Sequence, residues 1–226
     1  MFKSKAHAFS SINALSKGNY CSNFTAQEIL KEGNFGIGAF ESLNGELIIV
    51  HGKAYQIIDN TNVILCNSNV NISYAFVCNH DYKGFGYKFE NLTKQSLENK
   101  LLKIFDTKNL IQAVYAKAIV KQLHSRTFIR QEKPYVEIQK IKELQSEIWI
   151  QNKEIELVGF YTPSLFSNFN IEGFHWHYIS QDKDYGGHVI DMELESISLI
   201  IKPIHDLNYH SPVCLEFLEL DLSENK

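Results

Sequence analysis

Three histidines lie close together in the segment GFHWHYISQDKDYGGHVID, which spans residues 173–191. His175 and His177 are separated by one residue, so in a β-strand both side chains would point to the same face. A polar turn that ends in two glycines follows, and His188 opens a second alternating segment that a hairpin would bring back beside the pair. Three neutral imidazoles can bind one divalent metal ion and leave a fourth position for water or substrate. The spacing therefore predicts a catalytic metal site on one β-hairpin.

A single H-x-H pair on a surface hairpin is more often structural than metal-binding, but a third histidine on the matching arm favours the metal site. Imidazole ligands alone do not choose among Zn, Fe, Ni, Mn and Cu, because the ligand and geometry preferences of these metals overlap. We expect zinc, which would act as a Lewis acid.

The elements that must position these histidines are expected to be mostly strands. The chain contains 15 Phe and 11 Tyr, and many Ile/Val-rich stretches alternate with Asn, Gly and Asp. Residues 46–57 predict a β-hairpin that follows an Asn-Gly turn. Helices are expected at 25–33, where Thr25 can cap the first turn, and at 93–105, which has one apolar face. A strand is expected near 114–123.

The composition bounds the class of protein. The chain has 226 residues, 44% of them hydrophobic, which is enough for one large domain or two small ones. Its 22 Lys+Arg and 26 Asp+Glu give a formal charge of −4 without a basic run, so nucleic acid is not the expected partner. Neither a secretion signal nor a membrane span is evident, since the longest apolar runs are of strand length. We expect a soluble cytoplasmic protein.

Four cysteines are scattered along the chain without a C-x-x-C pair. This spacing argues against a cysteine-rich zinc site and against a disulfide framework. Buried thiols in a reducing cytoplasm are expected for Cys21, Cys66, Cys78 and Cys214.

Four blocks of the sequence, in one order, resemble segments of the α-acetolactate decarboxylase family. They are FSSINALSKGNY, EILKEGNFGIGAFESLNGELIIVHGKAYQI, SRTFIRQEKPY and LVGFYTPSLFSNFNIEGFHWHYISQDKDYGGHVIDMELES. The resemblance begins near Phe9 and ends near Leu222, so it extends over almost the whole chain. Four ordered blocks are far more specific than any one of them.

The resemblance implies an activity and a set of site residues. The zinc ligands would be His175, His177 and His188. Glu46 would be an active-site carboxylate beside the metal, and Arg126 the cationic residue that meets the substrate. The family reaction is the decarboxylation of (S)-2-acetolactate to (R)-acetoin and CO2.

The chemistry of this substrate agrees with such a site. 2-Acetolactate is a β-keto acid with a neighbouring hydroxyl, and the carbanion left by CO2 loss delocalises into the ketone as an enediolate. A zinc ion held by both oxygens would stabilise this enediolate intermediate as its charge develops. An arginine, charged at any working pH, can bind a carboxylate in a planar fork, and a glutamate can move a proton.

The resemblance also implies a fold. We expect an α/β, β-rich protein of two closely packed lobes, an N-terminal mixed sheet over 9–115 and a barrel-like metal-binding lobe over 116–226. The whole of residues 1–226 would form a single family unit, and two copies would assemble as a homodimer.

The sequence departs from the family pattern at two places. Ala39 stands where the family usually has threonine, and Asn44 where it usually has aspartate. Loss of the threonine hydroxyl would remove a contact to substrate or water. The family also has a glutamate near its C-terminus that approaches the zinc, and the candidates here are Glu216, Glu219 and Glu224.

Two competing interpretations remain. A cupin-like metal oxygenase or isomerase also places H-x-H on a strand, but it usually has a glutamate just after that pair and a third histidine several strands away. Here all three histidines fall within one predicted hairpin. The other interpretation is a non-catalytic zinc-binding module, which Ala39 and the short C-terminal segment would favour.

Overall fold

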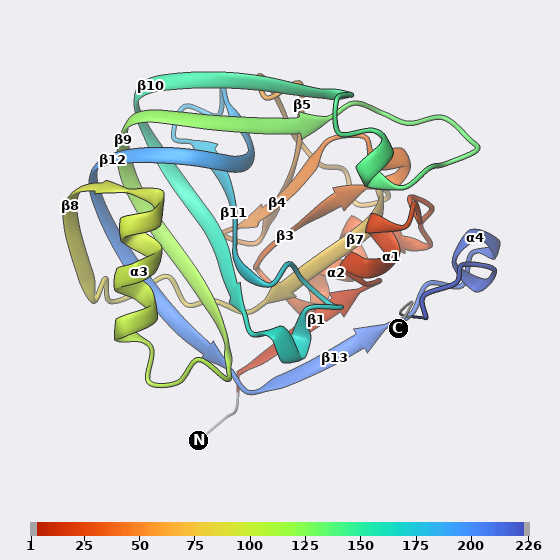
Figure 1. Cartoon of the computed structure of the whole chain (residues 1–226), viewed down its shortest axis with the longest axis horizontal. Helices are drawn as coiled ribbons and strands as arrows, with labels where there is room; N and C mark the ends of the chain where they lie inside the picture. Colours follow the sequence, from red (N-terminus) through yellow and green to blue (C-terminus); the bar gives the residue numbers. More distant parts are fainter. Residues whose placement is uncertain (1–3, 224–226) are drawn as a thin grey trace.

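Two β-sheets and four short helices make up the computed structural model, which describes residues 4–223 (Figure 1). The first sheet has eight strands in the order β13-β1-β7-β3-β4-β5-β6, with β2 paired to β7. Its strands are β1 (Lys5–Phe9), β2 (Phe24–Thr25), β3 (Phe35–Phe40), β4 (Glu46–Val50), β5 (Lys53–Ile58), β6 (Asn62–Leu65), β7 (Asn71–Cys78) and β13 (Asp206–His210). The sheet is mixed, because β1 and β13 are parallel while the other pairs are antiparallel.

The second sheet is antiparallel and contains the longest strands. Its order is β11-β10-β9-β12-β8, and β11 also pairs with β12. The strands are β8 (Tyr87–Thr93), β9 (Ile111–Phe128), β10 (Gln145–Thr162), β11 (Gly173–Ser180) and β12 (Gly186–Ile204). Because β11 pairs on both sides, β9, β10, β11 and β12 are each hydrogen-bonded to two of the other three.

The α-helices are α1 (Ile12–Ser16), α2 (Ala26–Glu32), α3 (Lys94–Ile104) and α4 (Leu215–Leu218). Two of them, α2 and α3, cover the outer faces of the sheets. Ile29 of α2 packs on the outer face of the first sheet, and Leu97 of α3 on the outer face of the second. The main core lies between the sheets, where Phe35 of β3 meets Phe160 of β10. The order of layers is therefore helix, sheet, sheet, helix.

The expected local elements are confirmed. Thr25 caps α2 in a reciprocal capping box with Glu28, and Thr93 caps α3 through the backbone N–H of Ser96. The hairpin expected at 46–57 is formed by β4 and β5. The strand expected near 114–123 belongs to β9, which extends well beyond both ends of that range.

Each sheet includes one strand from the other half of the sequence. β8 comes before residue 115 yet pairs with β12 in the second sheet, and β13 comes near the C-terminal end yet pairs with β1 in the first. The chain thus crosses between the sheets more often than once. The division into lobes at 9–115 and 116–226 stays a prediction.

The cysteines correct one expectation. Cys21 and Cys214 form a disulfide in the structure, whereas Cys66 and Cys78 are free thiols. The bonded residues are 193 positions apart, and they meet because β13 returns beside β1. Spacing along the sequence carries no sign of such a long-range contact, which is why the expectation of four free thiols was wrong.

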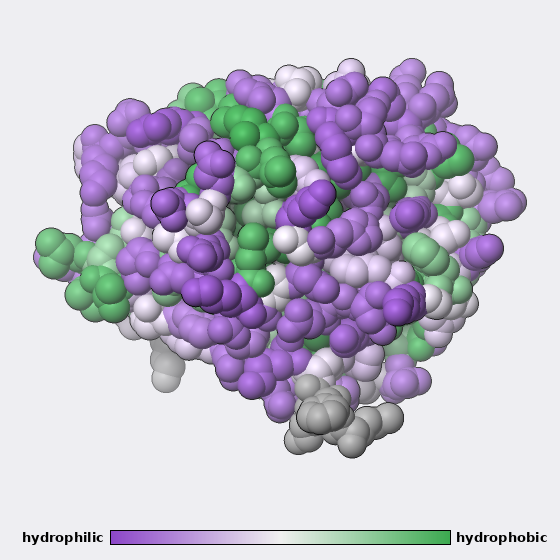
Figure 2. Space-filling model, turned by 180° about the vertical axis from the view of Figure 1, so that it is seen from behind, coloured by the Kyte–Doolittle hydropathy of each residue, from purple (hydrophilic) through white to green (hydrophobic). Residues whose placement is uncertain are grey.

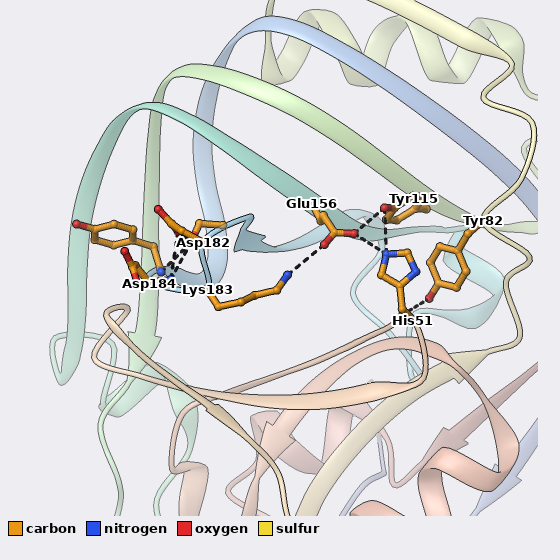
Figure 3. Close-up of polar contacts among 9 residues, drawn as sticks. His51, Tyr82, Tyr115, Glu156, Asp182, Lys183 and Asp184 are labelled. Carbon is orange, nitrogen blue, oxygen red and sulfur yellow. Dashed lines mark hydrogen bonds and ion pairs between the residues drawn. The ribbon is translucent and has the colours of Figure 1, made fainter.

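A polar cluster fastens the end of the β4–β5 hairpin to the second sheet (Figure 3). The carboxylate of Glu156 on β10 accepts hydrogen bonds from the Tyr115 hydroxyl at 2.6 Å and from Lys183 Nζ at 3.1 Å, and it lies 2.7 Å from His51 Nε2. His51 occupies the hairpin turn, and its backbone N–H donates to the Tyr82 hydroxyl at 2.9 Å. These contacts join the β4–β5 turn to β9 and β10.

Hydrophilic residues dominate the molecular surface in Figure 2, with hydrophobic residues gathered between them near the upper edge and centre of that face. Within residues 4–223, no helix is long and apolar enough to cross a membrane.

His80 predicts a pH dependence of the folding stability. Its ring is buried among Phe35, Tyr82 and Tyr115, and its Nε2 has no hydrogen-bond partner in the structure. Burial lowers the pKa of His80 to about 4, while Asp81 acts in the opposite direction. Since the unfolded chain takes up the proton first as the pH falls, this group stabilises the fold above its unfolded pKa of about 6.5 and that contribution is lost toward pH 4.

Between pH 7.5 and pH 5 the loss from His80 should be about 2 kcal/mol in the free energy of unfolding. His80→Phe keeps the ring, removes the unpaired nitrogen and should flatten the pH profile by that amount. Urea unfolding at both pH values measures the difference, and His205→Ala, an exposed histidine, is the control. Equal pH profiles for His80→Phe and the parent would contradict the prediction.

Candidate metal centre and active site

The β11–β12 hairpin brings the three histidines together. His175 and His177 lie on β11, and His188 on β12 is the direct cross-strand partner of His177. The ring centroids are 5.0 to 5.3 Å apart in all three pairings, and one ligand atom from each histidine lies within 4.8 Å of the others. The intervening Trp176 points to the opposite face and packs in the core beneath α3. Strand alternation therefore separates the polar site from the apolar core.

Hydrogen bonds direct the imidazole nitrogens. His177 Nδ1 lies 3.0 Å from the carbonyl oxygen of Leu47, so Nδ1 donates to this acceptor. His175 Nδ1 lies 2.9 Å from Asn170 Oδ1, and His175 Nε2 lies 3.2 Å from His188 Nδ1. Burial lowers the pKa of His177 to about 3 and the pKa values of His175 and His188 well below the usual range. The imidazoles are therefore neutral, as metal ligands must be.

The residues present fit a metal ion. His177 Nε2 is buried and has no hydrogen-bond partner in the structure, and a buried unpaired nitrogen is unfavourable unless something binds it. Nitrogens held at ~2.0–2.1 Å from one ion at tetrahedral angles lie about 3.3 Å apart. The 3.2 Å between His175 Nε2 and His188 Nδ1 matches this separation.

Glu46 and Arg126 reach the same place from different sheets. Arg126 on β9 is the cross-strand partner of His188, which puts both in one row of the second sheet. Glu46 is the first residue of β4 in the facing sheet. Its Oε1 lies 3.4 Å from an Arg126 guanidinium nitrogen, and its Oε2 lies 3.6 Å from His177 Nε2.

The Glu46–Arg126 pair has an unusual electrostatic setting. Burial raises the pKa of Glu46 to about 7, although the Arg126 guanidinium acts in the opposite direction. The guanidinium also stacks 4.3 Å over the ring of Phe128, which holds its plane. A carboxyl group that can both accept and return a proton near neutral pH thus lies beside a permanent cation and three neutral imidazoles.

All five residues line one small cavity of about 140 Å³. At ~30 Å³ per water molecule, this is room for roughly four or five waters, so only a small molecule fits. The apolar part of the wall consists of Ile12, Leu15, Ala39, Leu43, Tyr74, Phe128, Ile138 and Ile171. A wider groove of about 470 Å³ runs along Lys117, Glu154 and Ser198, but none of the three histidines lines it. The smaller cavity is therefore the candidate active site.

Comparison with known proteins places the whole chain in one family. The family model described as alpha-acetolactate decarboxylase matches residues 7–224. The chain belongs to the alpha-acetolactate decarboxylase family. It is 31% identical to the alpha-acetolactate decarboxylase of Brevibacillus brevis over 220 residues, which is 96% of this chain and 76% of that protein. The enzyme of Lactococcus lactis subsp. lactis (strain IL1403) is 32% identical over 206 residues, 91% of this chain and 86% of the relative.

Solved structures give the same result. The crystal structure of alpha-acetolactate decarboxylase from Bacillus subtilis strain 168 superposes with a TM-score of 0.94 at 26% identity, over 98% of this chain and 94% of the other. A Staphylococcus aureus protein described as similar to alpha-acetolactate decarboxylase superposes with a TM-score of 0.91 at 26% identity, over 97% and 94% of the two chains. The β-rich two-sheet fold is therefore the fold of the alpha-acetolactate decarboxylase family.

The departures from the family pattern lie at defined places. Ala39 lines the cavity on β3, directly across from Glu46 in the sheet register. The carboxylate of Glu216 forms an ion pair with Lys133, and Glu219 is the C-cap residue of α4. Neither is among the residues that line the cavity, and Glu224 is outside the described residues.

Sequence reasoning missed the groups that hold the ligands. Asn170 and the carbonyl of Leu47 are the partners of His175 and His177. An asparagine five residues before a histidine, and a backbone carbonyl on a distant strand, give no pattern of their own. Both residues lie in blocks that resemble the family, and nothing in those blocks sets either of them apart.

Proposed function

We propose that this member of the alpha-acetolactate decarboxylase family converts (S)-2-acetolactate to (R)-acetoin and CO2. The observation that carries the proposal is the convergence of three neutral imidazoles with the Glu46–Arg126 pair in one small cavity. A metal-binding group, a cation and a proton-transfer group are the functions that decarboxylation of a β-keto acid requires.

His175, His177 and His188 are the residues that would hold the metal, which we propose to be zinc. When bound, the metal supplies a Lewis acid that stabilises negative charge on the substrate oxygens as CO2 leaves. His175 and His177 are buried and held by hydrogen bonds to Asn170 and to the Leu47 carbonyl, so little reorganisation is required of them, while His188 is half-buried beside them.

Arg126 binds and orients the substrate in this proposal. Its guanidinium stays charged and offers a planar fork of donors that matches a carboxylate. The ring of Phe128 and the carboxylate of Glu46 hold the guanidinium inside the cavity. The carboxylate that leaves as CO2 would thus be placed on a defined side of the substrate.

Glu46 moves the proton. With a pKa of about 7, its carboxyl group can accept the hydroxyl proton of the substrate and return a proton to carbon. The apolar wall, which includes Leu15, Leu43 and Ile138, excludes water from this side of the cavity. Protonation from one fixed side would account for a single acetoin enantiomer.

The decisive experiment incubates purified protein with racemic 2-acetolactate and follows acetoin and CO2, with and without a chelator. We expect stoichiometric products, consumption of one enantiomer, and loss of activity with the chelator that added zinc restores. Metal-containing protein that forms no acetoin would favour the non-catalytic zinc-binding module. A cupin-like oxygenase or isomerase is disfavoured because the three histidines close within one hairpin.

Arg126→Lys tests the proposed substrate contact. The lysine keeps the positive charge but loses the planar, two-pronged contact and the stacking on Phe128. Loss of one charge-assisted hydrogen bond at ~1.5–3 kcal/mol corresponds to a fall in kcat/KM of roughly 10- to 150-fold. Steady-state kinetics measures this. The control is Arg130→Lys, which changes an exposed arginine four positions further on. A variant as active as the parent would remove Arg126 from the substrate site.

The same proposal includes the larger organisation of the protein. It comprises an N-terminal mixed-sheet lobe at 9–115, a barrel-like C-terminal lobe at 116–226 around the histidine hairpin, and a cytoplasmic homodimer. The circular pairing of β9, β10, β11 and β12 supports the barrel-like description. Light scattering of the purified protein tests the dimer.

A further inference from the structure

Asn170 lies directly behind one of the proposed metal ligands. It belongs to the loop before β11 and is fully buried, with Tyr74 of the first sheet and Thr162 of the second as its neighbours. Its side-chain amide makes three contacts: Oδ1 is 2.9 Å from His175 Nδ1 and 3.0 Å from the Tyr74 hydroxyl, and Nδ2 is 3.0 Å from Thr162 Oγ1. Every polar atom of this amide therefore has a partner, and one of the partners is His175.

The surrounding contacts orient the amide. The Tyr74 hydroxyl lies 3.0 Å from both the carbonyl oxygen of Phe169 and Asn170 Oδ1, and its one hydrogen is shared between these two acceptors. Nδ2 donates to Thr162 Oγ1, which leaves the oxygen of the amide facing the imidazole. An amide oxygen can only accept, so the hydrogen of the neutral His175 ring must be on Nδ1. The lone pair of Nε2 is then free on the side that faces His188.

We propose that Asn170 is a positioning residue that selects the Nδ1–H tautomer of His175, fixes the plane of its ring, and thereby sets the metal affinity of the site. The inference rests on the metal site of the proposed function and names a residue that controls it. The Leu47 carbonyl accepts a hydrogen bond from His177 Nδ1 and selects the Nδ1–H tautomer of that ring in the same way. Both ligands on β11 are thus held by neutral acceptors.

The neutral amide oxygen of Asn170 affects how basic the imidazole of His175 is. A carboxylate that accepts a hydrogen bond from a ligating histidine makes the imidazole more basic, so that it donates more electron density to the metal. A neutral amide oxygen in the same place has a smaller effect on the imidazole. Asn170 has no cation among its partners, and a buried carboxylate at its position would be costly unless the histidine or a metal compensated it. The amide therefore orients His175 while leaving the bound metal a stronger Lewis acid.

Two substitutions separate orientation from packing. Asn170→Leu has a similar size but removes the acceptor, and it should weaken zinc binding by roughly 10- to 100-fold in a competition with a chromophoric chelator. Asn170→Asp keeps an oxygen toward His175, and the Thr162 hydroxyl can rotate to donate to it. Its zinc affinity should equal or exceed that of the parent. Asn19→Leu, a change at a buried asparagine whose side-chain oxygen lies against the sulfurs of Cys21 and Cys214 and which does not line the cavity, is the matched control and should leave the affinity unchanged.

A second measurement does not depend on metal or turnover. In metal-free protein with ¹⁵N-labelled histidine, NMR should place the His175 proton on Nδ1 in the parent and in Asn170→Asp. In Asn170→Leu it should show a mixture of the Nδ1–H and Nε2–H tautomers of the neutral ring. A parent that binds no zinc would refute the proposed metal site, while the tautomer measurement would still decide the role of Asn170. Parent-like affinity and tautomer in Asn170→Leu would overturn the inference. A tenfold loss of affinity in Asn170→Asp would do the same, even if Asn170→Leu does not fold.

Discussion

His177→Ala should abolish acetoin formation and lower the zinc content of the purified protein at the same time. Of the three proposed ligands, His177 is the most constrained by its surroundings, since it is almost completely buried and held by a carbonyl of the opposite sheet. Its removal leaves two imidazoles, which is one fewer than a stable catalytic zinc site requires. The Lewis acid supplies several kcal/mol of stabilisation in the transition state, so the rate should fall by roughly 10³-fold or more.

The two properties must be measured on the same samples. Elemental analysis gives the zinc content, and acetoin formation from racemic 2-acetolactate gives the rate. His205→Ala is a suitable control, because His205 is exposed and outside the cavity. Full turnover in His177→Ala would mean that this histidine is structural.

The histidine hairpin was predictable because its information is local. Alternation along one strand puts His175 and His177 on one face, and a short polar turn brings His188 back to them. The same holds for the helix caps at Thr25 and Thr93, whose partners are three residues away. The three histidines could therefore be predicted to lie together from short-range geometry alone.

The prediction that Glu46 and Arg126 belong to the site rested on different information. The sequence around each is ordinary, a glutamate after an Asn-Gly turn and an arginine between Ser125 and Thr127. Only the resemblance to a family suggested them. They reach the histidines through the pairing of β9 with β12 and through the packing of one sheet against the other. Such contacts join residues 62 to 131 positions apart and leave no periodic trace in the sequence.

The same reason explains what was missed. Asn170 is recognisable only when Tyr74 and Thr162 are seen around its amide, and those residues come from different sheets. The disulfide between Cys21 and Cys214 depends on the parallel pairing of the first and last strands. Helices, hairpins and caps follow from neighbours in sequence, whereas the groups that orient a site follow from how the sheets meet.

Glu46→Gln should preserve the fold and metal binding but slow the reaction by ~10²- to 10⁴-fold, the usual worth of a positioned acid or base. The glutamine has the same shape, and its carbonyl oxygen can still accept from Arg126, whose guanidinium lies 3.4 Å away. It cannot take a proton from the substrate or return one to carbon. The fall should therefore appear in kcat more than in KM, because the lost interaction belongs to the transition state.

The outcome separates two roles for this carboxylate. Glu156→Gln makes the same chemical change in the hydrogen-bonded cluster at the other end of β4, and it should leave kcat near that of the parent. If Glu46→Gln binds zinc as tightly as the parent and is slow, Glu46 transfers the proton. A variant that stays fast but loses zinc would make Glu46 a metal ligand instead. Glu46 Oε2 approaches His177 Nε2 while Oε1 approaches Arg126, so the carboxylate lies between a proposed metal ligand and the cation proposed to hold the substrate. We therefore expect the slow, zinc-replete variant.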